Sequence, residues 1–163
     1  MTELLHSAGF FGTKANWAAD FTLLVGLIVA ALFTFGFYLA RQGKYEAHRW
    51  VQTTAVVLNL ILVFWLMVLP FRDFVAAPDN PAALPAIALA ITKIHGLVGS
   101  TGLIFGTFVA LRGNNLMIKP LRFNNYKLFM RIAYGLYMAA TLIGIFVYIT
   151  WFVTNPGEPP SYE

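Results

Sequence analysis

Four long runs of apolar residues dominate the pattern of the chain, and polar or charged positions close each of them. The runs cover residues 21–40, 50–71, 84–111 and 132–153. A helix rises about 1.5 Å per residue, so about 20 residues cross a hydrocarbon core of about 30 Å. Each run reaches that length. The pattern therefore predicts an all-α fold, an integral membrane bundle of four antiparallel transmembrane helices.

The segments outside these runs are short. Residues 1–20 are expected to form an outer tail, for which a short interfacial helix and a frayed end are both open interpretations. The connection at 72–83 contains two prolines and is expected to be a loop. Residues 154–163 are rich in proline and are expected to form a disordered outer tail. The transmembrane domain is thus assigned to residues 21–153.

Composition agrees with a membrane protein. Hydrophobic residues make up 59% of the chain and charged residues 11%, whereas a soluble domain averages about 25% charged residues. The mean hydropathy is +0.70. The chain has no cysteine, which excludes disulfides, thiolate metal sites and cysteine nucleophiles.

Basic residues gather in two of the connections. Between the first and second runs lie three basic residues and one acid: Arg41, Lys44, Arg49 and Glu46. Between the third and fourth runs lie five basic residues and no acid: Arg112, Lys119, Arg122, Lys127 and Arg131. By the positive-inside rule, both connections lie in the cytoplasm and both termini lie outside. The charge thus indicates topology and contact with the lipid bilayer, and no nucleic-acid partner is expected because no binding motif accompanies it.

One histidine and three glycines of the third run form a single stripe with little side-chain volume. His95, Gly99, Gly102 and Gly106 follow at helical spacing and share a face. One interpretation is close helix packing of the small-xxx-small kind. The other is a porphyrin that lies against the glycines with His95 as its axial ligand, which would make haem the cofactor.

The second and fourth runs carry further polar positions. His48, Gln52 and Asn59 share one face of the second helix, where they indicate either contacts between helices or a proton path or ligand site. Thr141 and Tyr148 lie on the facing side of the fourth helix and are also expected to make contacts between helices.

The two intramembrane histidines are expected to act separately. His48 begins the second helix on the inner side, whereas His95 lies near the outer start of the third, so the two cannot ligate one haem. Each is at most a metal ligand at its own site. The helices contain almost no acidic residues, and the chain has no HExxH motif, phosphate-binding glycine loop or GxSxG motif. An enzyme is therefore not expected.

Three segments carry a resemblance to a known family. They are KYEAHRWVQTTAVVLN at residues 44–59, IHGLVGSTGLIFGTFVALRG at 94–113 and KLFMRIAYGLYMAATLIGIFVYITWF at 127–152. Together they resemble the YozB/CtaM-like family of four-helix membrane proteins, which is linked to maturation of haem-copper terminal oxidases. The positions that match the family are His48, Arg49, His95, Tyr137, Gly144 and Tyr148.

The resemblance implies a non-enzymatic accessory or assembly factor for a haem-copper terminal oxidase or a related respiratory complex. It also implies subunits of that complex as partners and the inner (plasma) membrane of a prokaryote as the location. Two alternatives stay open. One is a small b-type haem or quinone-facing electron-transfer protein that uses His95, and the other is a structural subunit of a larger membrane complex.

Overall fold

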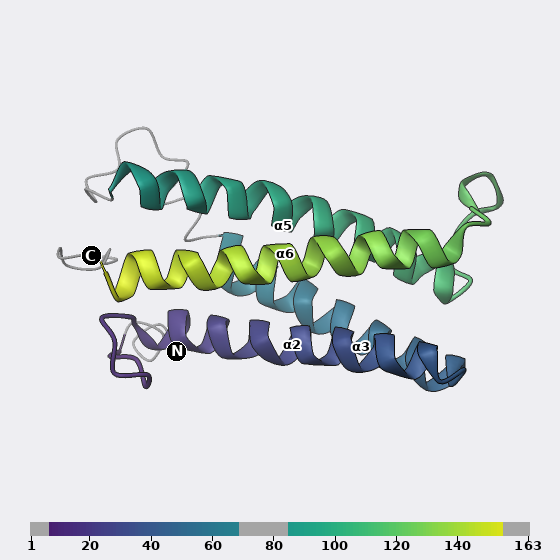
Figure 1. Ribbon diagram of the computed structural model, residues 1–163, viewed down its shortest axis with the longest axis horizontal. Helices are drawn as coiled ribbons and strands as arrows, with labels where there is room; N and C mark the ends of the chain where they lie inside the picture. The colour runs from purple at the N-terminus through teal and green to yellow at the C-terminus, as the bar shows by residue number, and fades with distance from the viewer. Residues whose placement is uncertain (1–6, 69–84, 155–163) are drawn as a thin grey trace.

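The protein folds into a bundle of long helices (Figure 1). The computed structural model describes residues 7–68 and 85–154. Within these ranges the long helices are α2 (Trp17–Arg41), α3 (Tyr45–Leu62), α5 (Ala86–Gly113) and α6 (Tyr126–Phe152), and α3 continues through one π-helical turn, η1 (Val63–Met67). A short 3₁₀ turn, η3 (Lys119–Leu121), lies between α5 and α6.

The predicted fold class is confirmed. All four long helices, with η1 counted as part of the second, are long and apolar enough to cross a membrane. The described residues contain no β-strand, although Ala8 and Asn16 form an isolated bridge. The architecture is compatible with a multi-pass membrane protein. The orientation with both termini outside stays a prediction.

Helices α2, α3 and α6 begin earlier than the apolar runs, whereas α5 begins two residues after the start of its run. α2 starts at Trp17 because the Asn16 side chain caps it by accepting from the backbone N–H of Ala19 at 2.9 Å. α3 and α6 start at Tyr45 and Tyr126, among basic residues. Their charge kept these residues out of the predicted apolar runs, but their long side chains suit helix ends at a membrane interface. The end of the second predicted run, beyond residue 68, lies outside the described residues.

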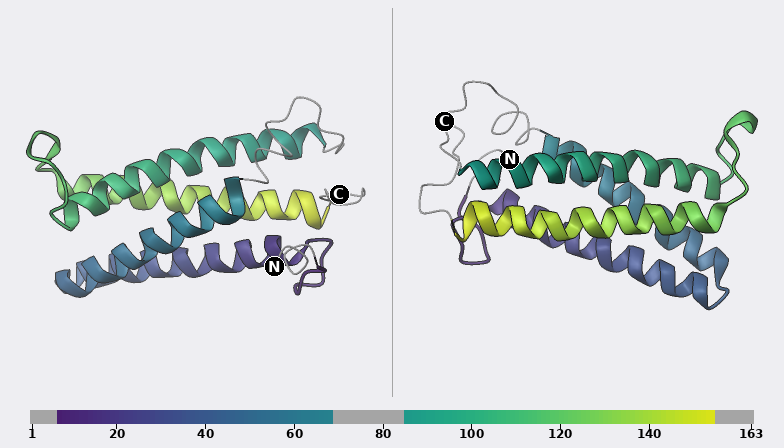
Figure 2. Two further views of the ribbon diagram at one scale, coloured as in Figure 1. Left: turned by 180° about the vertical axis from the view of Figure 1, so that it is seen from behind. Right: turned by 45° about the horizontal axis from the view of Figure 1, so that its top comes forward.

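The helices pack as two pairs. α2 lies along α3 and α5 lies along α6, and smaller contacts join α2 to α6 and α3 to α5 (Figures 1 and 2). The turn between α2 and α3 is short because Gly43 adopts a positive φ of 76°. We call the end that holds this turn and residues 114–125 the basic end. The opposite end, where α2 begins and α6 finishes, is called the terminal end.

Most of the helix surface faces outward. The most hydrophobic 18-residue windows of the four helices are only 11 to 22% buried. Large apolar side chains stand exposed on α3, η1 and α5, for example Ile104 at 71%, Leu97 at 69% and Phe64 at 66%. In water such surfaces would aggregate, whereas lipid chains cover them at no cost.

The segment before α2 is folded back onto the terminal end. Gly9 N donates to Ala15 O at 2.9 Å, Trp17 N donates to Ser7 O at 2.8 Å, and Lys14 N reaches Phe152 O at the end of α6 at 3.2 Å. Residues 7–16 therefore form an ordered loop, neither an interfacial helix nor a frayed tail. Residues 1–6, the predicted loop at 72–83 and the tail from 155 onward lie outside the described residues.

Candidate functional site

His48 joins α3 to α2. Its Nδ1 lies 2.7 Å from the carbonyl oxygen of Gly36, and the side chain is buried. Because a carbonyl oxygen only accepts, Nδ1 carries the hydrogen and donates. A Cβ on Gly36 would lie 2.5 Å from Nε2 of Gln52, which in turn donates to Phe33 O at 3.1 Å. The missing side chain at Gly36 thus lets two polar residues of α3 bond to the backbone of α2.

His95 joins α5 to α6 in the same manner. Its Nδ1 lies 3.0 Å from the carbonyl oxygen of Ala140 and so donates to it. A Cβ on Gly144 would lie 2.9 Å from Cε1 of the imidazole. Each helix pair therefore contains one histidine that sits against a glycine of the neighbouring helix and bonds to that helix's backbone.

The two histidines belong to different helix pairs. His48 is in the first turn of α3 at the basic end, and His95 is in the half of α5 that faces the terminal end. Within residues 7–68 and 85–154, no group of three His, Cys, Asp or Glu side chains is placed to hold a metal ion. The structure thus gives each histidine a backbone partner instead of a shared ligand set.

The glycine stripe of α5 does not form one continuous surface. A Cβ on Gly102 would lie 3.4 Å from Cβ of Leu136 on α6, whereas a Cβ on Gly99 or Gly106 would meet nothing within 4 Å. A porphyrin cannot lie against Gly99 and Gly102 together, because Leu136 occupies the space over Gly102. The residues therefore do not fit a haem seated on this stripe with His95 as axial ligand.

These two glycines give a matched test of helix packing. Gly102→Leu is expected to lower the unfolding temperature in detergent, since the added side chain must push Leu136 and α6 away from α5, an overpacking that costs about 1–3 kcal/mol. Gly99→Leu is expected to leave the unfolding temperature nearly unchanged, because the space there is open. Equal effects of the two substitutions would show that α5 does not meet α6 along Gly102.

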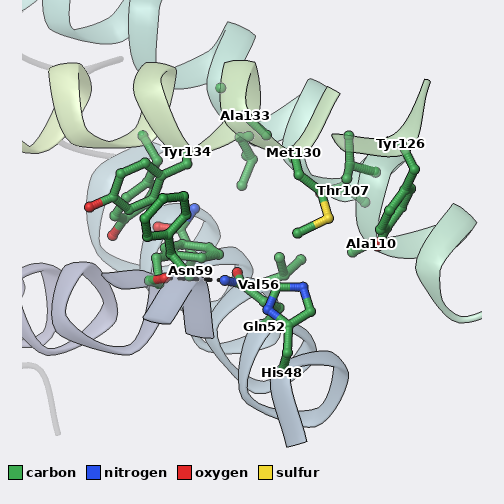
Figure 3. Close-up of a pocket in the computed structure, with 17 residues that line it drawn as sticks. His48, Gln52, Val56, Asn59, Thr107, Ala110, Tyr126, Met130, Ala133 and Tyr134 are labelled. Carbon is green, nitrogen blue, oxygen red and sulfur yellow. Dashed lines mark hydrogen bonds between the residues drawn. The ribbon is translucent and has the colours of Figure 1, made fainter. Parts of the chain in front are cut away.

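A cavity of about 70 Å³ lies between the four helices. Figure 3 shows His48, Gln52 and Asn59 following one another along α3, with Thr107 and Ala110 of α5 and Met130 and Tyr134 of α6 across from them. Phe33 and Phe37 of α2 complete the lining. The stripe predicted on the second helix thus faces the interior of the bundle.

The remaining predicted contacts divide into three kinds. Tyr148 donates to Asp20 of α2 and so joins two helices. Thr141 instead donates to Tyr137 O at 3.0 Å in its own helix, the usual alternative for a threonine hydroxyl, so it does not join helices as expected. Asn59 is buried and lines the cavity, and its side chain makes no hydrogen bond to any described residue.

Sequence reasoning missed a buried carboxyl at the terminal end. Asp20 is 0% exposed. Its Oδ1 accepts from the Tyr148 hydroxyl at 2.5 Å and its Oδ2 from the backbone N–H of Phe11 at 2.7 Å. The single phenolic hydrogen goes to Asp20, so in the 2.7 Å contact between Tyr148 and Thr13 the threonine hydroxyl donates. We call Asp20, Tyr148, Thr13 and Phe11 N the terminal cluster.

A signal for this cluster was present in the sequence. Asp20 is the fourth residue of α2 and lies in its first turn, where the helix dipole favours an acid. In the sequence, Asp20 directly precedes the first apolar run and was therefore interpreted as the boundary of that run. Once helix α2 is known to begin at Trp17, the same residue falls inside the helix and needs a partner.

The fold and these contacts define the class of protein: a bundle of four helices long and apolar enough to span a membrane, with each pair joined by a histidine and α2 joined to α6 by the terminal cluster. No protein-family model matches the chain, and no curated protein or solved structure matches it. The resemblance to the YozB/CtaM-like family therefore stays a prediction.

Proposed function

We propose that the protein is a non-enzymatic integral membrane accessory or assembly factor for a haem-copper terminal oxidase or a related respiratory complex. The non-enzymatic part of the proposal rests on one observation, that both intramembrane histidines are engaged in hydrogen bonds between helices. Each Nδ1 donates to a backbone carbonyl of the neighbouring helix, at 2.7 Å for His48 and 3.0 Å for His95. Histidines held in this way fix helix register. The choice of client rests on the resemblance of residues 44–59, 94–113 and 127–152.

The surface of the bundle supports a role in binding another membrane protein. Exposed aromatic side chains lie on α3 and η1, where Trp50, Phe64 and Trp65 are each at least 60% exposed. Aromatic residues are enriched where protein interfaces bury surface. At the basic end, exposed lysines such as Lys119 and Lys127 offer charge to acidic segments of a client. The prokaryotic inner membrane is part of the same proposal.

One purification tests the proposal against its alternatives. The full chain carrying an affinity tag is solubilised from its native membrane in mild detergent, and the eluate is analysed for partner subunits and by a reduced-minus-oxidised visible spectrum with a haem assay. We expect oxidase subunits to co-purify, and we expect the free protein, separated from them, to lack haem absorbance. A deletion strain is expected to contain less mature oxidase.

Two other outcomes of this purification would support the alternative functions. Near-stoichiometric haem in the free protein that disappears in His95→Ala would identify a b-type cytochrome and overturn the proposal. His48→Ala is the matched control, because it removes an equivalent histidine from the other helix pair. Stable co-purification with a complex that matures normally in the deletion strain would favour a structural subunit instead.

A further inference from the structure

The cavity between the four helices is lined by polar groups that have no partner among the described residues. Asn59 is 8% exposed and its side-chain amide makes no hydrogen bond within the described residues. The hydroxyl of Thr107 on α5 is fully buried and also lacks a partner there. Both residues line the cavity. Buried polar groups without partners are rare in folded proteins because each would forfeit its bonds to water. The Thr107 hydroxyl is such a group, and the Asn59 amide lines the same cavity without a partner among the described residues, which indicates that something else bonds to both.

The size of the cavity limits what that can be. Its volume is about 70 Å³, whereas a cavity known to hold benzene is roughly 150 Å³. An aromatic or quinone ring therefore does not fit. A water molecule needs about 10–15 Å³ of such space and two to four polar partners. The cavity has room for a few waters and supplies the partners.

His48 adds a third polar group. Its Nδ1 hydrogen is directed to Gly36 O, so in the neutral ring Nε2 is left as an acceptor, and the residue lines the cavity. His48 stands at the basic end of α3, and Asn59 follows eleven residues later, a distance of about 16 Å along the helix. The polar lining thus leads from the basic end to about half the thickness of a hydrocarbon core of about 30 Å.

We propose that this cavity is a water-binding site, in which a small cluster of ordered waters bonds to Asn59 and Thr107 and exchanges with solvent at the basic end. The waters bond to the Thr107 hydroxyl and the Asn59 amide and so bridge α5 and α3, as buried waters do in other folded proteins. The site shares His48 with the contact between α2 and α3, and it is separate from the His95 contact and from any client of the bundle.

X-ray radiolysis of the full chain in lipid nanodiscs tests this proposal. Radicals formed from a bound water oxidise the side chains next to it, and peptide mass spectrometry measures each rate. Met130 lines the cavity, and Met138 lies two turns further along α6, is also partly buried, and does not line it. We expect Met130 to be oxidised several-fold faster than Met138. In Asn59→Leu/Thr107→Val, the Met130 rate should fall toward that of Met138.

Two results would overturn the proposal. Equal rates for Met130 and Met138 in the wild-type chain would mean that no water is held beside Met130. A fast Met130 rate that the double substitution leaves unchanged would mean that bulk solvent reaches the methionine directly. If the double variant does not fold, Thr107→Val alone replaces it, because valine has the shape of threonine without the hydroxyl. Thr141→Val is its control, since that hydroxyl bonds to Tyr137 O and lies outside the cavity.

Discussion

Replacing Asp20 with alanine is expected to lower the free energy of unfolding in detergent by about 3 kcal/mol. The substitution leaves the Tyr148 hydroxyl and the backbone N–H of Phe11 without the acceptor that Asp20, itself 0% exposed, supplies to both. It also removes the bond from Phe11 N to Asp20, one of the contacts that hold the loop of residues 7–16 against the terminal end. Chemical or thermal unfolding followed by circular dichroism measures the loss. Limited proteolysis should cut the loop faster in the variant.

Matched substitutions separate this role from a general effect of removing an acid. Glu46 also lies in the first turn of a helix, but it is exposed, so Glu46→Ala should change stability by less than about 0.5 kcal/mol. Tyr148→Phe removes one hydroxyl from the terminal cluster and should cost about 1 kcal/mol. If Asp20→Ala proves no more harmful than Glu46→Ala, the terminal cluster does not hold the loop.

Replacing Gly36 with leucine is expected to cost about 3 kcal/mol, through overpacking and lost hydrogen bonds together. The new side chain would enter the space of Gln52, whose Nε2 lies 2.5 Å from the Cβ position, and would displace it from Phe33 O. Separation of α2 from α3 would also weaken the bond from His48 to Gly36 O. Thermal unfolding in detergent is the measurement.

Gly26 is the control for this substitution, because it lies on the same helix with nothing within 4 Å of its Cβ position. Gly26→Leu should change stability by less than about 0.5 kcal/mol. His48→Ala should reproduce part of the Gly36→Leu loss, since both affect the same bond. A Gly36→Leu protein as stable as Gly26→Leu would contradict the close approach of α2 and α3 at the basic end.

The helices themselves were predictable because a membrane imposes a length. Four apolar runs of about 20 residues or more leave little choice of architecture. The inward polar face of α3 was also predictable, since His48, Gln52 and Asn59 recur at helical spacing. The helix ends were less predictable. An apolar run stops at the first charged residue, whereas α2 continues through Arg41 and α3 already begins at Tyr45.

The partners of the polar side chains were not predictable. A backbone carbonyl such as Gly36 O or Ala140 O can accept a hydrogen bond whichever residue type carries it. The residue type therefore does not indicate which carbonyl will be the acceptor. The special place of Gly36 depends on which side of α2 meets Gln52, and that is decided by the packing of two helices. Thr107 could not be singled out from the sequence, because a hydroxyl in an apolar helix usually bonds to its own backbone, whereas the Thr107 hydroxyl does not.

The terminal cluster imposes an order on biogenesis. Each helix hairpin brings its own histidine and acceptor, so it can close as soon as it leaves the translocation machinery. Asp20 differs, because its side-chain partner Tyr148 lies 128 residues further along the chain. A nascent chain that has inserted α2 must carry this carboxyl without that partner until α6 arrives. Joining α2 to α6 therefore waits for α6, and a truncated chain lacking α6 would leave the Asp20 carboxyl without its Tyr148 partner.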